Sequence, residues 1–268
     1  MNHNLFKNNI KRILSSWNTL FLIVYSLALT TIQYITFNQF NYNYEPSVFF
    51  RMIGFDMTGY GTSMYIYSLP LLAALFGSGI FVNDKKINFH PAILGRIGRK
   101  EYYNTQLFQS FVLGGSAVII PYLFHSLIFF MLYPMTNPDI LQSYIGFGTK
   151  QIWLLQLLFY HPLLLWFVYV VFLFLVGGLL AQIGLVMSYR IKTKYFEILA
   201  PFLVVYALFL VANIINKGAI NPISYLTLRE LTNFTISQVM VNLVIWLGLV
   251  SIIFVIWHKQ TRGEYSDG

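Results

Sequence analysis

The side chains best able to bind a metal ion or transfer a proton are sparse in this sequence. The chain has five histidines, nine acidic residues and no cysteine. No two histidines are three or four residues apart, and no His-Glu-x-x-His stretch is present. Because a metal site draws on several convergent protein ligands, we expect no metal site in this chain. The histidines are His3, His90, His125, His161 and His258.

Motifs for phosphate binding and for proton transport are also missing. Residues 146–150, Gly-Phe-Gly-Thr-Lys, lack the spacing of a phosphate-binding loop and are typical of an ordinary turn. The chain is therefore not expected to hydrolyse ATP alone. Its long apolar stretches have no charged residue at their centres, and Glu197, near Lys194, lies only at the edge of one. This pattern disfavours an ion-coupled pump, which places ionisable groups inside the membrane.

The composition indicates that most of the protein surface faces lipid. Hydrophobic residues make up 57% of the 268 residues, charged residues make up 10%, and the mean hydropathy is +0.64. A soluble domain carries about 25% charged residues because its surface must be hydrated. The sequence therefore predicts an all-α membrane protein. The lack of cysteine excludes a disulfide scaffold and thiol catalysis.

Six apolar stretches approach the length of about 20 residues that a helix needs to cross the hydrocarbon core. We expect six transmembrane helices in a single transmembrane domain, with no separate soluble domain. The apolar stretch 151–160 is shorter and ends at His161-Pro162, so we expect a short helix there, at the outer interface. The expected spans lie near residues 17–37, 64–82, 108–132, 163–187, 196–215 and 241–257.

The distribution of basic residues predicts the orientation of the chain in the membrane. With both termini in the cytoplasm, 13 of the 17 Lys and Arg residues fall on the cytoplasmic side and 4 on the outer side. Cytoplasmic loops of membrane proteins carry such an excess. The net charge of +8 is explained by this topology, so no nucleic-acid partner is expected. The outer residues are Arg51, Lys150, Lys217 and Arg229.

An amphipathic helix is expected over residues 1–16, ahead of the first span. Apolar and polar side chains separate onto two faces at helical spacing. A basic helix of this kind lies on the inner leaflet, with its cations close to anionic lipid. The apolar face comprises Leu5, Phe6, Ile10, Ile13, Leu14 and Trp17, and the polar face comprises Asn8, Lys11, Arg12 and Ser15.

The fourth expected span carries small residues on one helical face. Gly177, Ala181, Gly184 and Ser188 follow each other at spacings of four, three and four. Small side chains let helix backbones approach closely in lipid. The pattern predicts close helix packing, either within this chain or across a dimer interface, and the sequence leaves both open.

The loop between the second and third expected spans is longer than a connector needs to be. It covers residues 83–103 and contains both apolar and basic residues. Pro91 suits the first turn of a helix, and Gly95 or Gly98 suits its end. We therefore expect a short helix near Pro91–Leu94 across the cytoplasmic membrane face. It would present Phe89, Ile93 and Leu94 to a partner.

The order of these elements resembles the membrane subunit of ABC exporters of the type-two permease family. This family includes drug, polysaccharide and bacteriocin-immunity exporters. In topology the resemblance covers essentially the whole chain, and at the residue level it rests on residues 84–103. Asp84 matches an acidic residue that often follows the second span, and Arg99-Lys100 matches a basic pair before the third span. Family members often have Lys as the third span begins, where this chain has Gln106.

The resemblance implies that the loop is a coupling helix, which docks into a groove on a separate ATP-binding subunit. Two such ATPases, holding ATP and Mg²⁺, would work with two membrane subunits, identical or different, in a bacterial plasma membrane. This chain itself would hold no cofactor. The substrate path would suit an amphipathic peptide, lipid or drug, with bacteriocin export or immunity as one case. The coupling residues would be Phe89, His90, Pro91, Ala92, Ile93, Leu94 and Arg96.

Two other classes of function stay open. A membrane-embedded enzyme would need a cluster of polar catalytic residues at one membrane face, and the sequence has no obvious one. A binding or immunity factor would act in the membrane without ATP. A channel is disfavoured because no filter motif of charged or carbonyl groups is visible.

Overall fold

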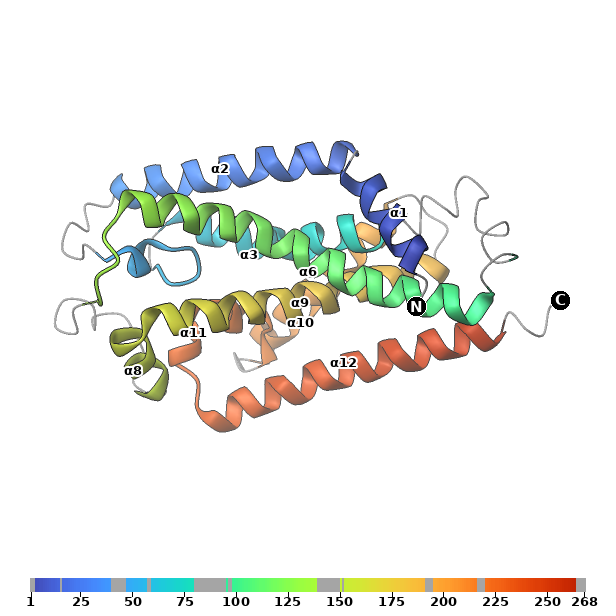
Figure 1. Cartoon of the computed structure of the whole chain (residues 1–268). Coiled ribbons are helices and arrows are strands. Elements are labelled where there is room, and N and C mark those ends of the chain that lie inside the picture. The colour runs from blue at the N-terminus through green and yellow to red at the C-terminus, as the bar shows by residue number, and fades with distance from the viewer. Residues whose placement is uncertain are drawn as a thin grey trace.

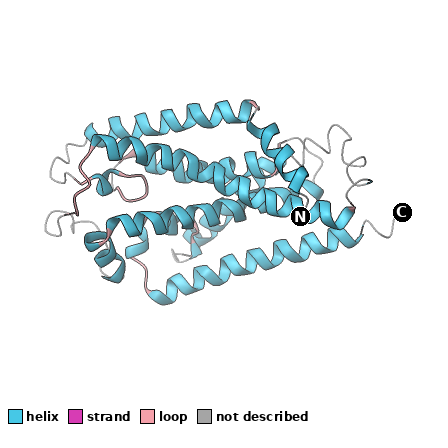
Figure 2. Cartoon of the chain, in the orientation of Figure 1, coloured by secondary structure: helices cyan, strands magenta, loops and turns pink. Residues whose placement is uncertain are grey.

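The residues that the computed structural model describes form helices joined by loops and turns (Figure 2). These are residues 3–14, 16–39, 47–56, 59–79, 95, 98–138, 150, 152–190, 195–215 and 220–263, and they contain no strand. The long helices are α2 (Trp17–Gln39), α3 (Tyr60–Gly77), α6 (Arg99–Leu132), α9 (Pro162–Arg190), α10 (Phe196–Ile214) and α12 (Ile236–Gly263). The short ones are α1 (His3–Leu14), η1 (Val48–Arg51), α8 (Ile152–Tyr160), η3 (Ile223–Leu226) and α11 (Leu228–Thr232).

Among the described residues, five helices are long and apolar enough to cross a membrane. The mean hydropathy of their best windows lies between 1.7 and 2.8. Each of the five overlaps one of the six expected spans, so the structure confirms an all-α, multi-pass membrane protein. The segments are Trp17–Phe37, Glu101–Leu132, Pro162–Ser188, Phe196–Ile214 and Ile236–Trp257.

The remaining expected span, near residues 64–82, differs from the helix found there. Helix α3 begins earlier, at Tyr60, ends at Gly77 and contains Pro70. It is not one of the five apolar helices. It contacts α2, α6, α9 and α10, so other helices surround much of its surface. A helix enclosed in this way does not need an apolar side chain on every face. Residues 80–82 of the expected span lie outside the described part of the chain.

The long helices pass back and forth between the two ends of an elongated bundle (Figure 1). Helix α1, the start of α6 and the end of α12 lie at one end, which we call the α1 end. Helices α8 and α11 lie at the other end, which we call the α8 end. The short helix expected over residues 151–160 is found as α8, and the helix expected ahead of the first span is found as α1.

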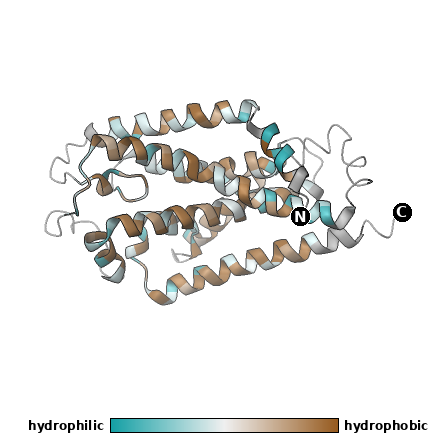
Figure 3. Cartoon of the chain, in the orientation of Figure 1, coloured by the Kyte–Doolittle hydropathy of each residue, from teal (hydrophilic) through white to brown (hydrophobic). Residues whose placement is uncertain are grey.

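Many large apolar residues are exposed on the outside of the bundle, and Figure 3 shows that hydrophobic residues prevail along its long helices. Helix α12 is the least enclosed of the five apolar helices. Its Val244 and Leu247 are 67% and 65% exposed. An apolar surface of this extent is unfavourable in water but natural in hydrocarbon. The outside of the bundle therefore fits a lipid environment.

Small residues allow α3, α6 and α9 to pack with their backbones close together. A Cβ atom added at Gly77 of α3 or at Gly114 of α6 would overlap the Cβ of Ala181 on α9. A Cβ at Gly177 would come within 2.7 Å of the Val118 side chain. Close approach of this kind increases dispersion contacts between helices where lipid supplies no hydrophobic drive.

The small-residue face of α9 continues toward α10. A Cβ at Gly184 would lie 2.7 Å from the backbone oxygen of Glu197, in the first turn of α10. The Ser188 hydroxyl donates to the Leu185 carbonyl of its own helix at 2.5 Å. The described contacts of Gly177, Ala181 and Gly184 are therefore made within one chain.

Replacing Gly114 with Ala should destabilise the bundle. The added methyl group would collide with Ala181 between two closely packed backbones, and overpacking of this kind costs about 1–3 kcal/mol. Gly248→Ala is the matched control, because nothing lies within 4 Å of its added Cβ. The control should be neutral or stabilising, since Ala favours a helix over Gly by about 1 kcal/mol. Thermal unfolding of the detergent-solubilised variants measures both, and equal melting temperatures would contradict the packing described for Gly114.

Candidate functional site

Polar side chains buried inside the apolar bundle form two groups, one near each end. The first surrounds an irregular segment between α2 and α3, Ser47–Asp56, which we call the buried loop. The second is an amide cluster where α1 meets α6, made of Asn9, Gln106, Gln109 and Ser110. All four cluster side chains are 3% exposed or less.

Every residue of the buried loop is enclosed by the rest of the protein. The loop contains the short helix η1 and then an irregular turn, and Val48, Met52 and Ile53 are fully buried. Sequence reasoning treated this segment as an outer connector, so it missed the loop. The apolar runs Val-Phe-Phe and Met-Ile were the available signal, because an exposed connector has little reason to carry them.

Side chains from three helices satisfy the backbone of the buried loop. The Gln33 amide of α2 donates to the Arg51 carbonyl at 3.2 Å. The Ile53 N–H donates to Nε2 of His125 on α6 at 3.4 Å, and the Gly54 N–H donates to the Thr62 hydroxyl of α3 at 3.1 Å. Irregular backbone at membrane depth is tolerated only where it finds partners like these.

Thr62 connects the loop to a buried carboxylate. Its hydroxyl accepts from Gly54 and donates to Oδ1 of Asp56. The other carboxylate oxygen, Oδ2, accepts the Gly59 N–H at 2.6 Å. Asp56 is only 4% exposed. A buried carboxylate is costly unless hydrogen-bonded, so Thr62 and Gly59 help to hold Asp56 and fix where the loop joins α3.

The tip of the loop lies tightly against α9. Gly54 has a φ of 84°, and a Cβ there would overlap the Tyr169 hydroxyl. That hydroxyl donates to the Leu226 carbonyl at 2.7 Å, and the Leu228 N–H donates to the Gly54 carbonyl at 2.9 Å. The segment around η3 and the loop tip therefore support each other, with Tyr169 between them.

A cation and a layer of aromatic rings surround the loop. The Arg51 guanidinium lies over the rings of Phe37, at 4.8 Å, and Tyr133, at 4.3 Å, an arrangement that favours a desolvated cation. On the interior side is a tyrosine layer, which we define as Tyr65, Tyr122 and Tyr169. The ring centroids of Tyr65 and Tyr122 are 6.1 Å apart, and those of Tyr122 and Tyr169 are 5.3 Å apart.

At the α1 end, the amphipathic helix is tied to the bundle by a polar contact. The Asn9 side chain donates to the Gln109 side chain at 3.0 Å, and the Phe6 and Phe108 rings are 6.2 Å apart. Arg12 donates to Asn9 at 3.4 Å. Asn9 is 1% exposed, so the inward face of α1 is not purely apolar. This contact was not expected from the sequence.

The amide cluster has unused hydrogen-bonding capacity. The amide nitrogens of Gln106 and Gln109 and the hydroxyl of Ser110 are buried, with no hydrogen-bond partner among the described residues. On the neighbouring face, the Gln182 amide of α9 donates to the Leu107 carbonyl at 3.4 Å. Gln106, an uncharged residue, stands where the resembling family often has Lys.

The expected coupling residues lie outside the described part of the chain. These are Phe89, His90, Pro91, Ala92, Ile93, Leu94 and Arg96. Of the loop that holds them, Gly95 and Gly98 are described. Gly98 precedes α6 with a φ of 82°. Helix α6 begins directly after it, at the α1 end (Figure 1).

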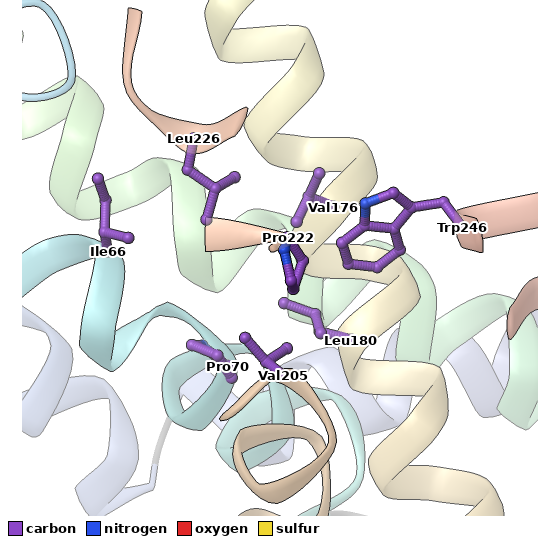
Figure 4. Close-up of a pocket in the computed structure, with 8 residues that line it drawn as sticks. All are labelled: Ile66, Pro70, Val176, Leu180, Val205, Pro222, Leu226 and Trp246. Carbon is purple, nitrogen blue, oxygen red and sulfur yellow. The ribbon is translucent and has the colours of Figure 1, made fainter. Parts of the chain in front are cut away.

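A small apolar pocket lies between α3, α9, α10 and α12 (Figure 4). Its cavity volume is only about 10 Å³, which is room for roughly one water molecule. Leu226, whose carbonyl accepts from Tyr169, forms part of its wall. The neighbouring Tyr225 donates to the Gln238 carbonyl at 3.0 Å, and burial raises the pKa of its phenol. The lining residues are Ile66, Pro70, Val176, Leu180, Val205, Pro222, Leu226 and Trp246.

Within the described residues, no three His, Asp or Glu side chains are grouped so that they could hold a metal ion. His125 lies in the bundle, with its ring centroid 4.1 Å from that of Phe129. Glu197, expected at the membrane interface, is buried in the first turn of α10. Comparisons with protein families, with curated proteins and with solved structures find no match for this chain.

Replacing Gly54 with Ala should destabilise the protein more than replacing Gly98 with Ala. Both glycines have a positive φ, which costs an alanine roughly 1–2 kcal/mol. Only Gly54 adds an overlap with Tyr169, because nothing lies within 4 Å of a Cβ at Gly98. The difference in melting temperature between the two variants isolates that overlap. Equal losses would mean that the loop tip does not pack against Tyr169 as described.

Proposed function

We propose that this chain is the membrane permease subunit of an ATP-driven exporter, similar to the type-two ABC permease family. In this proposal ATP and Mg²⁺ are held by two copies of a separate ATPase subunit. The chain lies in a bacterial plasma membrane with both termini in the cytoplasm. A second membrane subunit, identical or different, completes the substrate path.

The observation that supports this proposal best is the contact between α1 and α6. Helix α3 ends at Gly77 and α6 begins at Arg99, both at the end of the bundle where α1 lies (Figure 1). The Asn9–Gln109 hydrogen bond and the Phe6–Phe108 contact link the amphipathic helix to the first turns of α6. A force applied by a partner to the loop before α6 would therefore move α1 and α6 together. An energy-coupling subunit needs such a mechanical connection.

The proposal treats α3 as the sixth membrane span. The five apolar helices supply five crossings, and α3 runs among them from the α8 end to the α1 end (Figure 1). Six crossings return the chain to its starting side. The excess of basic residues then places the α1 end in the cytoplasm.

The substrate class in this proposal is an amphipathic peptide, lipid or drug. Charged groups are rare among the buried side chains, which are mostly aliphatic, aromatic or uncharged polar, as in the tyrosine layer and the amide cluster. An inorganic ion would need charged or carbonyl ligands along its path. A molecule with apolar groups and a few hydrogen-bonding groups fits this interior better.

The six-span topology can be tested with single cysteines, because the chain has none of its own. We expect Met135→Cys and Asn233→Cys to react with a membrane-impermeant maleimide added to intact cells. We expect Asn8→Cys and Gly95→Cys to react only after the membrane is opened. All four positions are exposed in the structure, so burial does not limit their reactivity. Labelling of the first pair only after opening would contradict the topology.

The coupling contact can be tested with Ile93→Asp and Leu94→Asp. A charge placed in an apolar docking contact should abolish co-purification of the ATPase from native membranes, while membrane insertion is retained. Asn88→Asp is the control, since it adds the same charge to the same loop at a polar position. Ile93→Leu keeps the apolar character and should retain the ATPase.

The two outcomes of that purification separate the proposal from its alternatives. A soluble ATPase present in stoichiometric amount, with vanadate-sensitive activity, is the expected result. Unchanged ATPase binding in both Asp variants would overturn the assignment of the docking site. A pure, folded chain with no ATPase would overturn the exporter proposal in favour of a binding factor or a membrane enzyme.

A further inference from the structure

We propose that the buried loop is a releasable plug that closes the outer end of the substrate path, with Thr62 as its latch. This inference rests on the proposed function for the direction of transport. The plug itself is argued from the contacts of Ser47–Asp56. Nothing in the pattern of apolar spans requires such a loop, because a short connector would join α2 to α3.

The way the loop is held distinguishes it from the helices around it. A helix satisfies its backbone groups internally, so it keeps its hydrogen bonds when it moves as a rigid body. Beyond the bonds within its own turns, such as those from Phe55 and Asp56 to the Met52 carbonyl, the loop is held by side chains of other elements, namely Gln33, Thr62 and His125. A relative movement of α2, α3 and α6 would break these bonds together. The position of the loop thus depends on the relative positions of α2, α3 and α6.

Thr62 supports two points of the loop with a single hydroxyl group. One hydroxyl receives the Gly54 N–H at the loop tip and donates to Asp56 at the loop end. Loss of this hydroxyl removes a partner from both at once. The remaining support of the tip comes from the Leu228 N–H and the Tyr169 ring, which belong to other parts of the chain.

The plug covers an aromatic surface. The Phe55 ring lies 5.2 Å from the Tyr169 ring, which continues into the tyrosine layer, and Ile53 lies against His125. Once released, the loop would uncover phenol and imidazole groups rather than carboxylates or ammonium groups. Such a surface would pass an uncharged or weakly charged molecule with apolar rings or chains. It would give little stabilisation to a strongly charged solute.

The plug also touches the wall of the apolar pocket. The segment that ends η3 supplies Leu226 to the pocket, and its carbonyl accepts from Tyr169 (Figure 4). Two residues later, Leu228 holds the tip of the loop through the Gly54 carbonyl. A displacement of Leu226 would therefore loosen the support of the plug.

The test uses Ile53→Cys, which places a thiol at a fully buried position of the loop. In intact cells this thiol should resist a membrane-impermeant maleimide. Adding Thr62→Val, which keeps the side-chain shape but removes the hydroxyl, should raise the labelling rate about tenfold, as expected for loss of buried hydrogen bonds. Thr62→Ser keeps the hydroxyl and should preserve protection.

Two controls separate release of the plug from general damage. Thr31→Val makes the same chemical change on α2, where the hydroxyl donates only to its own helix and is exposed, so it should leave protection unchanged. Leu185→Cys is fully buried on α9, sixteen residues beyond Tyr169, and should stay protected in the Thr62→Val background. Labelling of Leu185→Cys as well would show unfolding rather than release and would overturn the latch.

A second measurement tests whether the loop is released during the transport cycle. In proteoliposomes with the co-purified ATPase, Ile53→Cys should label faster during ATP hydrolysis than with ADP. Protection under all conditions, including in Thr62→Val, would overturn the plug. Absence of any co-purified ATPase would instead overturn the exporter proposal, while the result for Thr62→Val would still decide whether the loop is latched.

Discussion

The need to satisfy backbone polar groups away from water governs this structure. An unpaired N–H or C=O in hydrocarbon costs several kcal/mol, and the helices apolar enough to span a membrane pair these groups internally. The buried loop is irregular and enclosed, and it has partners suited to the same problem. A threonine hydroxyl, a glutamine amide and a histidine nitrogen each take one backbone group that a helix would have paired internally. The polar residues around the buried loop are explained by this requirement.

A second constraint is the distance between helix backbones. Lipid is as apolar as leucine, so helices gain little from hiding apolar side chains from it. They gain from contact, and the glycines and alanines along α3, α6 and α9 remove the side chains that would prevent it. The result is a tight three-helix centre with α2 and α10 against it and α12 loosely attached. A tight centre keeps the loop partners in register, because Thr62, His125 and Tyr169 come from those same three helices.

Sequence reasoning located the helices well where apolar runs were long. The stretches near 163–187 and 196–215 lie within α9 and α10, whose ends agree to within a few residues. The sequence prediction placed the start of α6 too late. The first turns of that helix, from Arg99, are polar, and a search for apolar stretches does not include polar residues. It could not foresee the buried loop, whose apolar runs are short and without helical periodicity. The partners of that loop are far away in the chain, with His125 lying 72 residues beyond Ile53.

The buried loop also has a consequence for how the protein is made. At synthesis rates of about 5–20 residues per second, His125 follows Ile53 by roughly 4–14 seconds, and Tyr169 and Leu228 follow later still. Until then the backbone groups of the loop have few of their final partners, so the segment cannot settle at its final depth when α2 and α3 first insert. The loop must wait on the aqueous side of the membrane or in the insertion machinery. A late step in the folding of this chain is therefore the packing of the buried loop against helices that are synthesised after it.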